Sequence, residues 1–71
     1  MQLYKLPRNE RFKLLEQPTI PPDALEGNKE EVYKLLGLDG MYCNCLNEQQ
    51  ERVYFAAWTE VEIVNEPNNL A

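Results

Sequence analysis

The pair Asp39-Gly40 lies between apolar residues, in the stretch Leu38-Asp39-Gly40-Met41. An Asp-Gly pair in this setting is the strongest short-range signal for a β-hairpin, because a type I′ turn needs a positive φ at both central residues. A hairpin requires a strand on each side of the turn. We therefore expect residues 32–38 to run into the turn and residues 41–46 to return from it, with Met41, Cys43 and Cys45 on one face.

The segment before the turn also carries helix signals. Asn28 could cap a helix, Gly37 stands where a helix would stop, and three apolar residues follow helical spacing: Val32, Leu35 and Leu36. A helix this short is not stable by its own propensity, so tertiary pairing can override it. We favour the strand, and the alternative is an α+β fold with one short helix at 28–36.

Three further segments read as strands. They are residues 11–15, in which Phe12 and Leu14 share a face, the apolar run 52–58, and residues 59–64, in which Val61 and Ile63 point inward beside glutamates. A chain of 71 residues is one domain at most. We predict a mainly β fold over residues 1–64, a small five-stranded antiparallel SH3-like barrel or bent sheet, followed by a flexible tail at 65–71.

Three prolines, Pro18, Pro21 and Pro22, fall within five residues. Proline has no backbone donor and a fixed φ, which excludes both a helix and a central strand here. Residues 16–28 should therefore form a long Pro-rich surface loop. Loops of this length usually have a role, so the segment is either a contact surface or a plain connector, and nothing within it decides between them.

The residue types exclude most catalytic chemistry. The chain has no Ser and no His, so neither a Ser-His-Asp triad nor a Cys-His pair can form, and its three glycines are too far apart for a phosphate-binding loop. Cys43 and Cys45 would point the same way on a strand, where a disulfide between them would be strained, and a zinc site would need two further ligands. We expect a non-enzymatic protein with two small half-buried structural thiols, no metal and no cofactor.

The charges are unevenly distributed. The net charge is −5, with +3 in residues 1–13 and −8 in the remainder. Phosphates must be neutralised by basic side chains, so we expect no direct nucleic-acid binding. The acidic body serves solubility or steers the chain toward a basic partner. No apolar run reaches bilayer length, and the first residues lack a hydrophobic signal segment, so we expect a soluble intracellular protein with no membrane contact.

Two groups of residues are candidates for partner binding. The basic head offers Lys5, Arg8 and Arg11, on a segment that would either dock on a partner or cover an edge of the barrel. Alternation along the strands should also leave some tyrosines outward or at a rim, and Tyr33 and Tyr54 are the candidates. Tyrosine suits protein interfaces because it combines a rigid ring with a polar tip.

Three patches carry a resemblance to a group of short bacteriophage proteins. They are Leu6-Pro7-Arg8, the hairpin Leu38-Asp39-Gly40-Met41-Tyr42 followed by Cys45, and Ala56-Ala57. The likeness spans residues 6–64, and the hairpin patch is its most specific element. The chain departs from the pattern at Cys43 and Asn44, where the group more often has Ser and an aromatic residue.

Within that group the chain is similar to a phage early transcription regulator. The resemblance implies a protein that binds host RNA polymerase, inhibits initiation and promotes antitermination. It does not transfer individual binding residues. We expect a monomer in the host cytoplasm. The alternative reading is a structural or assembly accessory protein of the virion.

Overall fold

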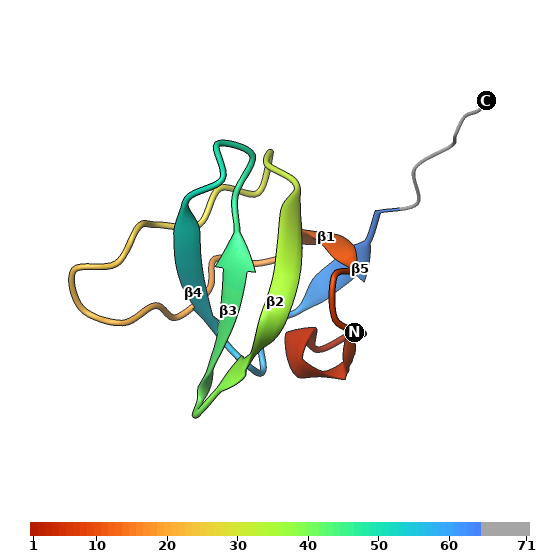
Figure 1. Cartoon of the computed structure of the whole chain (residues 1–71), viewed down its shortest axis with the longest axis horizontal. Helices are drawn as coiled ribbons and strands as arrows, with labels where there is room; N and C mark the ends of the chain where they lie inside the picture. The colour runs from red at the N-terminus through yellow and green to blue at the C-terminus, as the bar shows by residue number, and fades with distance from the viewer. Residues whose placement is uncertain (65–71) are drawn as a thin grey trace.

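The computed structural model describes residues 1–64, which form an antiparallel sheet in the order β4-β3-β2-β1-β5 (Figure 1). The elements are a short 3₁₀ helix η1 (Leu3–Lys5) and the strands β1 (Arg11–Leu14), β2 (Tyr33–Asp39), β3 (Tyr42–Leu46), β4 (Arg52–Ala56) and β5 (Val61–Ile63). The first four strands follow one another as a meander, and β5 pairs back onto β1. The predicted mainly β, five-stranded fold is confirmed. The predicted tail at 65–71 lies outside the described residues.

One face of the bent sheet forms the core. Every strand contributes to it, as does the N-terminal segment, and its members are Leu3, Leu6, Phe12, Leu14, Tyr33, Leu35, Cys43, Cys45, Val53, Phe55 and Val61. The expected inward faces are confirmed at Phe12, Leu14 and Val61, because alternation on a pleated strand is a local property. The expectation for Ile63 is wrong, since its side chain is 39% exposed. Ile63 lies at the end of β5, an edge strand of the sheet. Residues 1 and 2 pair with Glu60 and Val61 and do not reach as far as Ile63.

The β2–β3 hairpin forms where it was expected, but its turn is shifted by one residue. Asp39 pairs with Tyr42, which leaves Gly40 and Met41 as the two central residues. Of these two residues, only Gly40 has a positive φ, of 65°. A positive φ at the first central residue alone is the pattern of a type II′ turn, not the expected type I′. Met41 therefore lies in the turn and is exposed, instead of sharing the buried face of Cys43 and Cys45.

The helix alternative at 28–36 is wrong, although its capping signal is real. The Asn28 side chain accepts a hydrogen bond from the backbone of Glu30, and its carbonyl accepts one from Glu31. The chain makes a single turn there and enters β2 at Tyr33, one residue later than expected. Pairing of β2 with β1 and β3 satisfies the backbone of this segment and buries Tyr33 and Leu35, which a short exposed helix would not achieve.

The Pro-rich loop is held at its neck. A Cβ on Gly27 would lie 2.7 Å from Pro18 Cγ and 2.8 Å from Leu14 Cδ1, so the two ends of the loop touch only because residue 27 is glycine. The Gln17 side chain also donates to the Gly27 carbonyl, and Ile20 packs against the core. In Figure 1 the loop extends to the side of β4.

The N-terminal segment packs along the barrel. The Met1 carbonyl accepts a hydrogen bond from Val61, and Gln2 bridges to Glu60, so residues 1 and 2 cover the edge of β5. Leu3 and Leu6 are buried in the core. The edge-covering alternative for this segment is therefore observed. Among residues 1–64, no helix has the length and apolar character needed to cross a lipid bilayer.

Candidate functional site

The five residues predicted to contact a partner do not form one site. Lys5 is exposed at the end of η1, and Arg8 is exposed on the segment that leads to β1. Arg11 on β1 lines a shallow hollow with Tyr33, and Tyr54 on β4 lines a different one beside the Pro-rich loop. The predicted residues thus fall in three separate places on the surface and core.

Tyr33 is a core residue, which corrects the expectation of a rim position. Only 1% of it is exposed, and its ring packs between Phe12 and Phe55, at centroid distances of 5.8 and 5.0 Å. The phenol accepts a hydrogen bond from the backbone of Asn28 and donates one to Glu31 Oε1, both at 3.0 Å. Burial raises the pKa of Tyr33 to about 12. A partner therefore cannot reach this side chain in the folded protein.

Four exposed apolar side chains lie at one end of the barrel (Figure 1). Four large side chains form what we call the barrel-end surface: Tyr4 (48% exposed), Leu38 (62%), Met41 (53%) and Trp58 (46%). Figure 1 shows the β2–β3 turn, the β4–β5 link and η1 at this same end of the molecule. Single exposed apolar residues are ordinary on a protein surface, but a group of four at one end is characteristic of an interaction site.

Backbone hydrogen bonds hold the three segments of this surface together. The Tyr4 N–H donates to the carbonyl of Ala57 at 3.0 Å, and the Ala57 N–H donates to the carbonyl of Met41 at 2.9 Å. Leu3 similarly bonds to Thr59, whose hydroxyl donates to the Ala56 carbonyl at 2.6 Å and fixes the turn around Trp58. The surface therefore rests on a rigid framework.

Leu38 is exposed because the hairpin extends beyond the barrel. It is the cross-strand partner of Cys43, and directly paired residues of an antiparallel ladder lie on the same face of the sheet. Cys43 is fully buried, whereas Leu38 is mostly exposed on that same inner face. The tip of the hairpin thus overhangs the end of the barrel and turns an apolar face toward the solvent.

Two basic residues lie at the border of the barrel-end surface, and the exposed carboxylate of Asp39 lies within the hairpin between Leu38 and Met41. Lys5 follows Tyr4 directly, and its ammonium lies 5.9 Å from the centre of the Tyr4 ring, at the outer limit of a cation–π contact. The Arg8 guanidinium lies over Gly37, 3.9 Å from where a Cβ of that residue would be, and so borders the base of the hairpin. Two of the predicted basic residues therefore flank an apolar surface that sequence patterns did not indicate.

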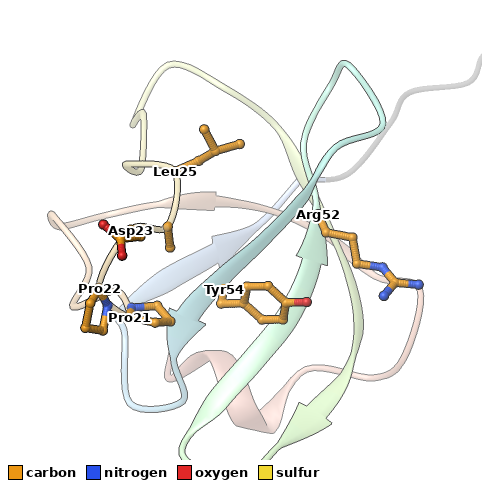
Figure 2. Close-up of a pocket in the computed structure, with 7 residues that line it drawn as sticks. Pro21, Pro22, Asp23, Leu25, Arg52 and Tyr54 are labelled. Atoms are coloured by element: carbon orange, nitrogen blue, oxygen red, sulfur yellow. The ribbon is translucent and has the colours of Figure 1, made fainter.

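Tyr54 belongs to a second surface, the groove between β4 and the Pro-rich loop (Figure 2). The groove has a volume of about 430 Å³ and is lined by Pro21, Pro22, Asp23, Ala24, Leu25, Arg52 and Tyr54. Arg52 and Tyr54 are two residues apart on β4, so their side chains emerge on the same side of the strand, as Figure 2 shows. The loop therefore forms one wall of this groove.

The cysteines have no features of a reactive site. Both are free and completely buried, where half-buried thiols were expected. Burial raises the pKa of each thiol, most strongly for Cys45, and so suppresses the nucleophilic thiolate. Within the described part of the chain, no group of three or more His, Cys, Asp or Glu residues is placed to hold a metal ion.

No family model matches the chain, and no curated protein or solved structure is similar to it. Residue chemistry and geometry are therefore the basis for assigning a site.

Sequence reasoning missed the apolar members of the barrel-end surface for an identifiable reason. Met41 and Leu38 were both placed on the strands of the hairpin, and strand alternation alone does not indicate which of these residues the solvent reaches at the tip. The signal that could have found Trp58 is its place in the four-residue link between β4 and β5, since the centre of a tight link faces outward.

Proposed function

We propose that this chain is a non-enzymatic protein-binding regulator of phage type that binds host RNA polymerase and alters transcription through its barrel-end surface. One observation carries the protein-binding part of the proposal, namely that Tyr4, Leu38, Met41 and Trp58 are exposed together on a hydrogen-bonded framework. The choice of polymerase as the partner, and of inhibition and antitermination as the outcome, is supported by the resemblance of the hairpin patch.

The composition of this surface suits a protein partner. Trp, Tyr and Met are enriched at the centres of protein interfaces, where they supply large contact area that excludes water. Two of the four side chains have aromatic rings with a polar atom at the edge, which allows them to be exposed before binding and buried afterwards. Nucleic acid would need a wide basic surface, and this chain carries a net charge of −5.

The basic border narrows the chemistry of the partner. Lys5 and Arg8 flank the apolar centre, so the complementary surface should combine an apolar patch with acidic residues at its border. Charges at the border of an interface act mainly on the association rate and on its dependence on salt. The apolar centre should therefore set the lifetime of the complex, and the two basic residues its rate of formation.

The apolar centre can be tested by replacing Trp58 with Ser. Affinity purification from host lysate at low salt, followed by mass spectrometry, should recover RNA polymerase with the parent chain. Trp58→Ser should lose it, with a change in melting temperature of only a few degrees, because the indole is 46% exposed. Leu15→Ser is the matched control, since Leu15 is equally exposed but lies outside the surface.

Three outcomes would contradict the proposal. The first is that the parent chain recovers no polymerase subunit. The second is that Trp58→Ser and Leu15→Ser bind equally well. The third is that the chain is abundant in purified virions, which would favour the accessory role.

Charge reversal tests the basic border separately. Lys5→Glu combined with Arg8→Glu should slow association about tenfold at low salt and weaken its salt dependence, while the dissociation rate stays the same. Lys34→Glu, an exposed basic residue on β2, is the control. Equal association rates for all three chains would remove Lys5 and Arg8 from the interface.

A further inference from the structure

The strand β4 presents an open edge. Along an antiparallel strand, backbone N–H and C=O groups point alternately toward one neighbour and the other. Glu51 accepts a hydrogen bond from Asn47 and so faces β3, whereas the N–H of Ala56 donates to the carbonyl of Thr19 and so faces away from β3. Both observations give the same alternation, in which Arg52, Tyr54 and Ala56 direct their backbone groups to the outer edge.

The Pro-rich loop occupies only one end of that edge. Thr19 bonds to Ala56, but within residues 1–64 no hydrogen bond engages the outward N–H and C=O groups of Tyr54. Beyond Thr19 the loop leaves the strand, and the groove of about 430 Å³ opens between Pro21–Leu25 and β4. The loop therefore acts as a wall beside the exposed edge, as Figure 2 shows for the groove residues.

The groove also contains a cation without a partner. Arg52 is exposed at the far end of β4, and among the described residues no carboxylate forms an ion pair with it. Tyr54 is half-buried and offers its ring between Arg52 and the loop. An occupant of this groove would meet backbone donors and acceptors, one aromatic face, the positive charge of Arg52 and, on the loop side, the negative charge of Asp23.

We propose that the β4 edge binds an extended segment of another protein, with an acidic residue placed opposite Arg52, as an added antiparallel or parallel strand. Main-chain hydrogen bonds to Arg52 and Tyr54 would supply affinity, and side-chain positions at every second residue would supply selectivity. An acidic residue of the segment lies beside Arg52, and an apolar residue lies between Tyr54 and the wall formed by Pro21 and Leu25. This surface shares no residue with the barrel-end surface, so the inference does not rest on the proposed function.

The loop limits the length of the added strand. At the Ala56 end the outward N–H is already taken by Thr19, so pairing begins at Tyr54 and extends past Arg52. Two outward-facing residues of β4 then contribute up to four backbone groups. The matching segment is short, about three to five residues, which is the usual range for an edge strand.

The test uses the isotope-labelled chain and a capped peptide, Thr-Glu-Thr-Val-Thr-Glu, as the probe, in which glutamate and valine lie two residues apart and so share one face in either strand direction. Addition of the peptide should shift the amide signals of Arg52, Tyr54 and the 21–25 loop. It should also slow hydrogen exchange at the Tyr54 amide by about tenfold or more at saturation, because that N–H gains a partner. Unchanged spectra at millimolar peptide, or shifts confined to other strands, would overturn the proposal.

Two modified peptides separate the backbone from the charge contribution. A version N-methylated at alternate residues loses the donors that face β4 and should not bind, whereas binding through side chains alone would survive this change. A version with lysine in place of glutamate should bind about fivefold more weakly, as expected for one exposed charge pair. If the N-methylated peptide binds as tightly as the original peptide, the strand-addition geometry is wrong. If the lysine peptide binds as tightly as the glutamate peptide, the acidic preference is wrong.

Variants of the chain provide the reciprocal test. Arg52→Glu should prefer the lysine peptide over the glutamate peptide, which reverses the parent preference. Arg8→Glu, in the barrel-end border, should bind both peptides as the parent does, so that a failure here and a failure of polymerase binding are distinguishable. Light scattering should show a monomer in all cases. A dimer in which the Tyr54 amide is already protected from exchange without peptide would assign the β4 edge to a second copy of this chain instead.

Discussion

The phenol of Tyr33 should contribute measurably to stability, because it ties the turn before β2 to the core. In Tyr33→Phe the ring keeps its packing against Phe12 and Phe55, but the hydrogen bonds to Asn28 and Glu31 are lost. Two hydrogen bonds at about 1 kcal/mol each, partly offset by water reaching Asn28, give a loss of about 1–2 kcal/mol. For a domain of this size that corresponds to a fall in melting temperature of about 4–16 °C.

The difference in stability between the parent chain and Tyr33→Phe should also depend on pH. An unfolded tyrosine ionises near pH 10, whereas burial raises the pKa of Tyr33 in the folded chain to about 12. Between these values the unfolded state binds fewer protons than the folded state, so the stability of the parent chain falls as pH rises. At pH 11 the advantage of the parent over Tyr33→Phe should have shrunk by about 1 kcal/mol, and the buried thiols affect both chains equally.

Urea unfolding at pH 8, 10 and 11 provides the assay, with Tyr54→Phe as the control for a tyrosine in the surface groove. Tyr54→Phe should lose little stability at pH 8, because the Tyr54 side chain lines the surface groove and makes no side-chain hydrogen bond within residues 1–64. A loss below about 0.5 kcal/mol for Tyr33→Phe at pH 8 would place the phenol in solvent. A difference that stays constant up to pH 11 would show that folding does not raise the pKa of Tyr33.

The glycines and cysteines give three further expectations. Gly27→Ala should destabilise the fold by about 1–3 kcal/mol in urea unfolding, because the new Cβ would lie 2.7 Å from the stiff ring of Pro18, and an unchanged midpoint would mean that the loop neck is open. Gly40→Val should lower the free energy of unfolding by about 1–2 kcal/mol through its φ of 65° alone, since no atom lies within 4 Å of the new Cβ. Gly37→Ala, whose new Cβ would have its nearest neighbour at 3.9 Å, is the near-neutral control for both variants. Cys43 and Cys45 should react with a thiol reagent at pH 8 only at the rate of unfolding, and immediate reaction in the native state would contradict their burial.

The sequence predicted those parts of the fold that depend on neighbouring residues. Alternation identified the inward faces at Phe12, Leu14 and Val61, and the Asp-Gly pair located the hairpin. The turn moved by one residue because Asp39 pairs with Tyr42, and a type II′ turn needs a positive φ only at Gly40. The number of strands and their places along the chain could be predicted, while the turn type depends on the register of the whole ladder.

Tyr33 shows what local patterns could not provide. Val32 and Tyr33 are adjacent, and a period of two allows either of them to face the core. The choice follows from pairing of Tyr33 with Phe12, about twenty residues earlier in the chain, and from loop atoms that satisfy its hydroxyl. Because the partner-binding candidates were chosen by residue type, one of them turned out to be the centre of the core.

The two surfaces also differ in how they relate to the stability of so small a domain. A chain of this length buries a limited share of its apolar area, so each large apolar side chain left in solvent lowers the stability that the fold could reach. Yet the core is completed by Cys43, Cys45 and Ala56, while Trp58, the largest side chain, is nearly half exposed beside Met41 and Leu38. The hydrogen bonds of Ala57 and Thr59 hold the link in that outward conformation. Places where local choices oppose maximal burial on a rigid framework are expected at functional sites, and the exposure of Trp58 supports the proposal that the barrel-end surface binds a partner independently of any resemblance.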